Sequence, residues 1–222
     1  MMIKMRTCLL VCLLIVAGGS LPAQDFIIKS GVNLSNLAGF RGDEYTTLIK
    51  TDPHIHFHIE TTLVFPITER YSMQGGLKYS GRGHSFEYFR SGEFFGEDHS
   101  VNTQMHYLDI PLSLKASFQK GNCELYVFAG GYLGAGLHGT DYRAIETPNG
   151  TVEKSESKVF GDDAYFNRWD YGAVGGAGAN FGPLILEFSY SLGLADIAND
   201  DNDDLSTKNR LLSLSLGYRF ME

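Results

Sequence analysis

The sequence predicts an all-β protein, an eight-stranded antiparallel up-and-down transmembrane β-barrel. Apolar and polar residues alternate through eight separate segments. The connections between these segments are alternately short and long, and the chain opens with residues typical of an export signal. We expect strands at roughly 26 to 37, 53 to 65, 70 to 82, 104 to 118, 123 to 138, 168 to 181, 183 to 195 and 208 to 220.

The first 23 residues have the pattern of a secretory signal peptide. Lys4 and Arg6 precede an apolar run from Cys8 to Ala17, and small residues follow in "GGSLPAQ". The apolar run is too short to span a bilayer, so we expect cleavage after Ala23 rather than a retained anchor. The domains are then a signal peptide at 1–23 and an outer-membrane β-barrel domain at 24–222.

The charge of the mature chain argues against a nucleic acid partner, and its cysteine content argues against an intramolecular disulfide bond. The whole sequence has a net charge of −8, and loss of Lys4 and Arg6 with no acidic residue makes it −10. Nucleic-acid binding requires a basic surface, so we expect no nucleic acid partner. Cys8 and Cys12 lie in the leader, which leaves Cys123 without a partner for an intramolecular disulfide bond.

The alternation is clearest in "QMHYLDIPLSLKASF", residues 104 to 118. One parity of this segment is apolar: Leu108, Ile110, Leu112, Leu114, Ala116 and Phe118. The other parity is mostly polar: Tyr107, Asp109, Ser113, Lys115 and Ser117. Successive side chains of a strand point to opposite faces, so such a strand has one apolar and one polar face.

The connections distinguish the two ends of the predicted barrel. Tight turns, "PITER", "QKGN" and "GP", follow the second, fourth and sixth strands, whereas the connections after the other strands are long and polar. Outer-membrane barrels have short periplasmic turns and long extracellular loops. We therefore expect four loops outside the cell, at 38 to 52, 83 to 103, 139 to 167 and 196 to 207.

Alternation alone leaves open a soluble, lipocalin-like barrel with its apolar face inward. Aromatic residues favour the membrane barrel, because they stand on the apolar face where strands meet the short turns, as interfacial girdles do. This predicted girdle comprises Phe26, Phe65, Tyr71, Phe118, Phe181 and Phe220. The polar face carries a balanced set of charges that we expect to neutralise one another in the lumen: Lys29, Glu60, Lys78, Asp109, Lys115, Glu124, Glu187 and Arg219.

Six segments of the chain, in order, carry a family resemblance: "GVNLSNL" (31 to 37), "GGLKYSGRG" (75 to 83), "YLDIPLSLK" (107 to 115), "YGAVGGAGANF" (171 to 181), "SLGLADI" (191 to 197) and "KNRLLSLSLGYRF" (208 to 220). They resemble the PorT-like outer-membrane β-barrel proteins of Bacteroidota. The resemblance implies the barrel fold and an outer-membrane location. The secretion and gliding role of the name-giving member has no support in this sequence. Met221 and Glu222 follow Phe220, so the terminal signal for barrel assembly departs from the usual ending.

The segment "HIHFHIE", residues 54 to 60, raises the question of a metal site. By parity its three histidines face the lumen, and His56 with His58 could grip one metal ion as an H-x-H pair. A further ligand would have to come from a neighbouring strand, such as Asp109 or His138. The favoured interpretation is that the imidazoles fill an interior that needs hydrogen-bonding groups, so we expect no metal and no cofactor.

Three other motifs have structural interpretations. "DIANDDNDD", residues 196 to 204, spaces its acids like calcium ligands but lacks the glycine and glutamate of an EF-hand, so a solvated loop is favoured. The aromatic residues between 86 and 95 are expected to pack together on strands that continue above the membrane. The glycine-rich "AVGGAGANFG" has no following helix to hold a nucleotide, and its glycines are expected to relieve crowding.

Catalysis is the rival functional class, because some eight-stranded outer-membrane barrels modify lipid A. Lipid A deacylases present a His-x-Ser pair on a strand, and none of the seven histidines here is followed two places later by serine. His84–Ser85 and His99–Ser100 are adjacent, and adjacent side chains of a strand face opposite ways. We therefore expect no enzyme activity.

The expected function is structural or adhesive. The lumen of so small a barrel is filled by side chains, and the barrel anchors the extracellular loops in the membrane. A lipid-modifying enzyme, or transport of a small ligand or metal through the lumen, is the alternative. The expected partners are outer-membrane lipid and lipopolysaccharide, the barrel-assembly machinery during biogenesis, and an extracellular protein or glycan that contacts the loops.

Overall fold

The computed structural model describes residues 25–38, 50–91, 96–146, 152–160, 166–197 and 207–220. Within these ranges the strands form one antiparallel sheet, which confirms the predicted all-β fold class. In the same ranges no helix is both long and apolar enough to cross a membrane. The predicted signal peptide lies outside the described residues.

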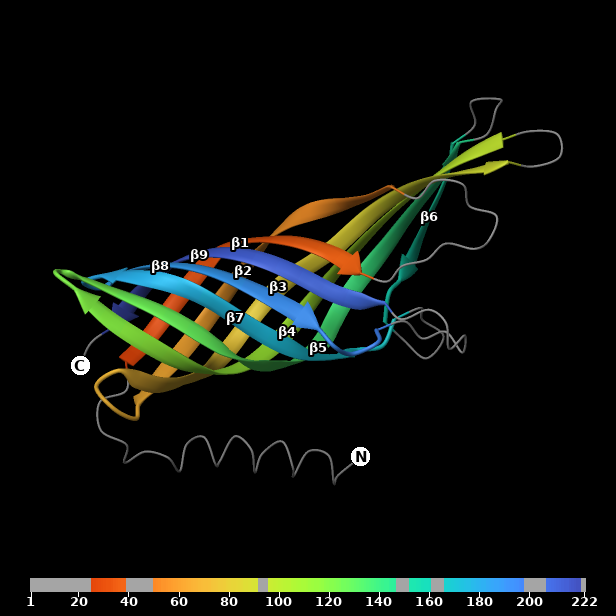
Figure 1. Ribbon diagram of the computed structural model, residues 1–222. Helices are drawn as coiled ribbons and strands as arrows, with labels where there is room; N and C mark the ends of the chain where they lie inside the picture. The colour runs from red at the N-terminus through yellow and green to blue at the C-terminus, as the bar shows by residue number, and fades with distance from the viewer. Residues whose placement is uncertain are drawn as a thin grey trace, which may run out of the picture.

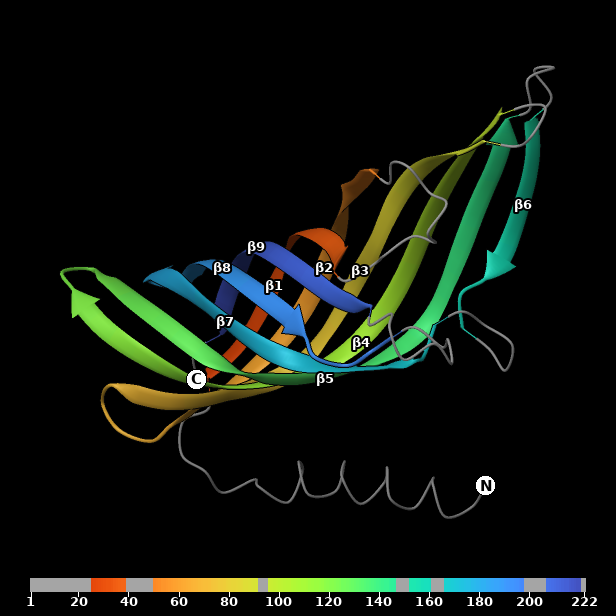
Figure 2. The ribbon, with the colours of Figure 1, turned by 45° about the vertical axis from the view of Figure 1, so that its right-hand side comes forward.

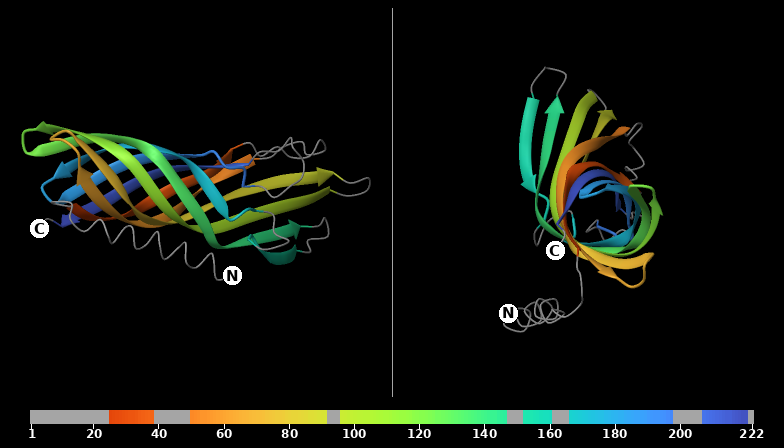
Figure 3. Two further views of the ribbon diagram at one scale, coloured as in Figure 1. Left: turned by 90° about the horizontal axis from the view of Figure 1, so that it is seen from below. Right: turned by 90° about the vertical axis from the view of Figure 1, so that its left-hand side faces the viewer.

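The described strands are β1 Asp25–Ala38, β2 Lys50–Pro66, β3 Tyr71–Ser91, β4 Gly96–Lys120, β5 Cys123–Glu146, β6 Val152–Lys158, β7 Trp169–Phe181, β8 Leu184–Gly193 and β9 Lys208–Phe220. All of these except β6 close into a barrel in the order β1–β2–β3–β4–β5–β7–β8–β9, which is seen end-on in Figure 3. The ring is completed by β9 pairing with β1, from Phe26 opposite Phe220 to Ala38 opposite Lys208. Closure gives every ring strand two hydrogen-bonded neighbours, which is the condition for a sheet to cross a membrane.

The two ends of the barrel differ as predicted. One end, which we call the turn end, carries the short connections at residues 67–70, 121–122 and 182–183. Gly121 and Gly182 have φ angles of 62° and 61° there, a conformation that glycine adopts without strain in a tight turn. We call the opposite end the loop end.

At the loop end the structure corrects two of the predicted loops. In the segment 83 to 103, β3 continues to Ser91 and β4 begins at Gly96. In the segment 139 to 167, β5 continues to Glu146 and β6 pairs with its outer part, Val152 to Lys158 opposite Glu146 to Thr140. Figures 1 and 2 show β3, β4, β5 and β6 rising together from the barrel as a protruding sheet. The strands here extend beyond the alternating apolar residues that mark a membrane strand. The sequence pattern therefore did not predict these extensions.

The other two predicted loops, 38 to 52 and 196 to 207, lie largely in 39–49 and 198–206, outside the described residues. Most of the candidate calcium-ligand segment, residues 196 to 204, also lies outside the described residues. In the aromatic segment 86 to 95 the strands do continue outward, but the side chains lie outside the described part of the chain.

The outward side chains of the ring form an apolar band around the barrel. The band covers residues 26–34, 55–65, 71–79, 108–118, 125–137, 169–181, 184–190 and 212–220. Leu114 and Leu216 are 62% and 67% exposed there, an exposure that suits contact with lipid rather than water. Five of the six predicted girdle residues are strongly exposed near the turn end, namely Phe26, Tyr71, Phe118, Phe181 and Phe220, and Phe65 is half-buried.

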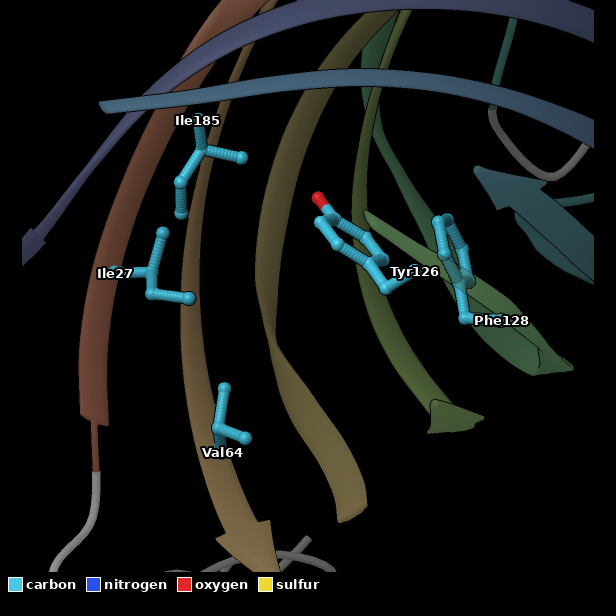
Figure 4. Close-up of a cluster of buried hydrophobic side chains, with 5 residues drawn as sticks. All are labelled: Ile27, Val64, Tyr126, Phe128 and Ile185. Atoms are coloured by element: carbon cyan, nitrogen blue, oxygen red, sulfur yellow. The ribbon is translucent and has the colours of Figure 1, made fainter. Parts of the chain in front are cut away.

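An apolar layer fills the lumen near the turn end (Figure 4). Ile27, Val64 and Ile185 pack with the rings of Tyr126 and Phe128. The two rings lie over Gly178 and Gly176 of β7, where any Cβ atom would collide with them. These glycines therefore make room for aromatic side chains inside a narrow barrel.

Candidate functional site

The first charge cluster of the lumen is centred on Lys29 of β1. Its Nζ lies 2.8 Å from Glu60 Oε1 of β2 and 2.8 Å from Glu187 Oε1 of β8. Thr62 donates a hydrogen bond to Glu60, and the Tyr126 hydroxyl donates one to Glu187, each at 2.8 Å. Lys29 is only 2% exposed, so its ammonium is stabilised by these carboxylates instead of by water.

The second cluster is centred on Arg82 of β3, which the sequence analysis missed. Its guanidinium bonds Asp109 of β4 through Nη2 and Asp170 of β7 through Nη1, and it stacks over the Tyr107 ring at 4.3 Å. Tyr132 and Asn209 each donate a 3.0 Å hydrogen bond to Asp170. Four ring strands are thereby joined to β3 through one buried cation.

A usable sequence signal for Arg82 and Asp170 did exist. Arg82 has the same parity as Lys78 and ends a predicted strand, and Asp170 stands near the start of another. Strand ends are where parity assignments are least secure, because a bulge of one residue reverses the face. With these two, the predicted set gains one positive and one negative charge and remains balanced.

The third cluster lies at the turn end around Glu124 of β5. Lys115 Nζ lies 3.1 Å from Glu124 Oε1, and Arg219 Nη2 lies 3.2 Å from Oε2. Asn180 and Ser117 also donate hydrogen bonds to Glu124, at 2.9 and 2.7 Å. The remaining predicted charge, Lys78, donates to Ser213 Oγ at 3.3 Å in mid-lumen. All eight predicted lumen charges thus lie inside the barrel wall, fully or partly buried.

The space left between these clusters is small. A cavity of about 30 Å³ lies among Lys29, Glu60, Lys78, Asp109 and Glu187. One water molecule needs roughly 10 to 15 Å³ measured in this way, so the cavity holds one or two waters. A hydrated ion or a metabolite does not fit in it.

An apolar plug closes the loop end of the lumen. Val159 and Phe160, which follow β6, pack inside the barrel mouth with Met105 and Tyr107 of β4. The backbone holds the plug in place, because Val159 N–H donates to Gly139 O at 3.1 Å. His84, above the apolar band, meets the Phe166 ring edge-on beside the plug, and burial there lowers the pKa of His84 to about 4.

The structure separates the histidines that parity placed together. His58 faces the lumen, is 1% exposed, and hydrogen-bonds Ser215 Oγ at 2.9 Å. His56 instead lies on the outside of the wall, against Gly81 and Gly83 of β3. A Cβ on Gly81, which would point outward like Tyr79, would lie 2.9 Å from the His56 Cβ. From β2 the His56 side chain points inward, opposite to exposed Ile55 and Phe57, but it ends over the outer side of β3 and does not reach the lumen.

A bulge in β2 causes this difference. The β2–β3 ladder pairs Pro53 with His84 and then resumes only at His58 with Ser80, so β2 has one extra residue. In this gap Ser35 of β1 bonds both the N–H and the carbonyl of Gly83 on β3, which places β1 and β3 side by side. The β2 segment between Pro53 and His58 consequently lies on the outer side of its neighbours.

This geometry excludes the alternative of an H-x-H metal pair at His56 and His58. His56 and His58 lie on opposite sides of the barrel wall, Asp109 binds Arg82, and His138 is exposed on the outside. In the described part of the chain, no group of three or more His, Cys, Asp or Glu side chains is arranged to hold a metal ion.

Fold and lumen together define a class: a small transmembrane β-barrel whose interior is filled by paired charges and closed by an apolar plug. Residues 23–199 match the family model described as the outer membrane protein beta-barrel domain, and the chain belongs to that family. Among curated proteins none matches this chain. The barrel is therefore an outer-membrane protein.

Three solved structures are similar to this chain at low sequence identity. Ail, the attachment invasion locus protein of Yersinia pestis, is 14% identical with a TM-score of 0.40, over 88% of this chain and 98% of its own. OprG of Pseudomonas aeruginosa is 14% identical with a TM-score of 0.44, over 90% and 97%. Neisserial surface protein A is 10% identical with a TM-score of 0.39, over 88% and 97%.

Proposed function

We propose that this protein is a structural and adhesive outer-membrane anchor that presents its protruding sheet to an extracellular protein or glycan. The observation that carries the proposal is the sheet of β3, β4, β5 and β6, which extends beyond the apolar band. All seven residues of β6 are exposed, and among the described strands β6 pairs only with β5. Its second edge offers backbone donors and acceptors to a partner.

The finer assignments belong to the same proposal. The chain is a PorT-like member from Bacteroidota, exported by its signal peptide and inserted by the barrel-assembly machinery, with lipid and lipopolysaccharide around it. The proposal includes no enzyme activity, since Lys29, Glu60, Arg82 and Asp170 are engaged in buried charge pairs rather than open to a substrate. Transport is disfavoured by the small cavity and the plug.

The adhesive function is tested by shortening the protruding hairpin. Arg143 and Ser155 are ladder partners, so residues 144–154 can be replaced by Asn-Gly, a dipeptide that closes a two-residue hairpin turn. We expect cells with the intact protein to bind one or more components of an array of extracellular proteins and glycans, and cells with the shortened hairpin to lose that binding. Heat-modifiability on gels checks that the variant barrel is folded.

A matched control is Arg70→Ala, which alters an exposed residue at the turn end and leaves the extracellular surface intact. It should bind as the unaltered protein does. Binding by the shortened variant equal to that of the full protein would overturn the role of the hairpin. An array on which the full protein gains nothing over a deletion strain would overturn adhesion itself.

The filled lumen predicts the behaviour of the purified protein in planar bilayers. We expect no steady ion conductance from the folded barrel, because paired charges and a cavity of about 30 Å³ leave no water-filled path. Phe160→Gly should not by itself open the pore, since the Arg82 cluster lies beneath the plug. Regular single-channel steps from the unaltered protein would contradict the anchor model and favour transport.

A further inference from the structure

The outer face of the barrel carries a row of imidazoles that the lumen and the protruding sheet do not explain. The row runs across four strands and consists of His54 and His56 on β2, Tyr79 on β3, His106 on β4 and His138 on β5. The rings of His54 and His56 stack at 6.1 Å, and those of His106 and His138 stack at 4.3 Å. Tyr79 stacks on His106 at 5.6 Å, and its hydroxyl is 2.8 Å from His106 Nδ1.

The row is built by two bulges, one in β2 and one in β5. The β2 bulge places His56 over Gly81 and Gly83, where a side chain would block it. A second bulge, in the β4–β5 ladder, leaves Leu137 unpaired and brings His106 opposite His138. Gly81 is the ladder partner of His106, and His56 lies over Gly81, so His56 is a neighbour of His106 and the two histidine pairs form one cluster.

The height of this row on the barrel identifies what it faces. On β4 and β5 the histidines come directly after the apolar band, since Leu108 and Leu137 are 37% and 46% exposed. On β3 the row begins at Tyr79, the last residue of the band. Beyond the hydrocarbon core of a bilayer lies the headgroup layer, where the lipid phosphates are. His106 and His138 therefore lie at the level of the phosphates of the outer leaflet, whereas His56 lies within the band between exposed Ile55 and Phe57.

The charges around the row favour an anion. Lys158 of β6 is exposed and is the ladder partner of Thr140, which lies two residues from His138 on the same face of β5. The next acidic residue toward the tip of the protruding sheet is Glu156, the ladder partner of Tyr142. The charged neighbours that act on His56 are His54 and His106, and the one that acts on His106 is His138. Burial, together with the neighbouring His138, lowers the pKa of His106, so this imidazole gains a positive charge only below the ordinary histidine range near 6.5.

We propose that this histidine row is a binding site for the phosphate groups of outer-leaflet lipid, strengthened by acidification. At neutral pH His106 and His138 donate N–H hydrogen bonds to a phosphate oxygen, and exposed Lys158 supplies a permanent positive charge. His56 Nε2 is buried and His54 Nε2 bonds Ser85 Oγ, so these two side chains lie behind the site. In acid the imidazoles of His106 and His138 become cations and bind the phosphate more tightly. The site depends on the outer-membrane location and is independent of the proposed adhesive function.

The test measures lipid retained by the full-length folded protein in detergent, by native mass spectrometry at pH 7.5 and 5.5. The probes are lipid A with its phosphates, dephosphorylated lipid A, and inorganic phosphate. For the phosphorylated lipid we expect retention to rise about fivefold for each imidazole that becomes charged, the effect of one cation near an anionic lipid surface. Dephosphorylated lipid A and inorganic phosphate should show no such rise.

The variant is His106→Gln with His138→Gln, which keeps hydrogen-bonding groups and removes the charge. It should abolish most of the acid-dependent gain without changing heat-modifiability. The matched control is Arg210→Gln, an exposed residue on β9 that lies outside the row and should leave the pH dependence unchanged. Equal retention of phosphorylated and dephosphorylated lipid, or a full acid gain in the double variant, would overturn the proposal. Neither result would affect the proposed adhesive function, which is tested separately with the shortened β5–β6 hairpin.

Discussion

Arg82→Met should destabilise the folded barrel by about 3 to 5 kcal/mol, the usual effect of removing one partner from a buried charge pair. The substitution leaves Asp109 and Asp170 without their shared cation, and both carboxylates are buried. The free energy of unfolding is measured by urea titration of the protein in lipid vesicles, with the gel shift between folded and unfolded forms as the readout.

Two further variants show that the loss arises from the unpaired carboxylates. Arg82→Met combined with Asp109→Asn and Asp170→Asn should regain much of the lost stability, because the uncompensated charges are gone. Arg143→Met, whose side chain is partly exposed beside Asp141, should lower the unfolding free energy by less than about 1 kcal/mol. An Arg82→Met protein as stable as the unaltered one would show that the cluster does not hold the strands together.

Leu114→Arg should reduce the unfolding free energy in vesicles by about 2 to 4 kcal/mol, the effect of arginine on the lipid face near the bilayer midplane. Leu114 is on β4, within the apolar band and 62% exposed. The cost arises because the guanidinium must leave water for hydrocarbon.

Gln104→Arg on the same strand and face is the matched control. Gln104 is exposed beyond the apolar band, so arginine there should lower the unfolding free energy by no more than about 1 kcal/mol. Equal effects at the two positions would show that the apolar band does not lie in hydrocarbon.

Most of the barrel wall could be predicted from the sequence. The segment 208 to 220 coincides with β9, and the segments that became β1, β7 and β8 differ from the strands by two residues at most. These strands carry apolar residues outward and polar residues inward without interruption, so the period of two is read directly from the residues. The lumen charges followed from the same parity, as Lys29, Glu60 and Glu187 illustrate.

The bulges and the protruding sheet were not predictable in this way. The bulge in β2 changes its register with β3 and leaves no composition signal, so the sequence could not show that His56 lies over β3 instead of reaching the lumen. All of β6 is exposed and its residues show no alternation of apolar and polar side chains, so it lacks the pattern that separates a strand from a loop.

The sequence by itself determined the membrane barrel, the number of strands in its ring, and the sign and face of most lumen charges, because all of these depend on local alternation and on connection length. Only the tertiary structure decided which charges meet. Lys29 and Glu187 are 158 residues apart, and Arg82 joins Asp109 and Asp170 across the lumen. It likewise decided that His54, His56, His106 and His138 form one row outside, because ring closure and two bulges set the register between strands, and alternation within one strand contains no information about its neighbours.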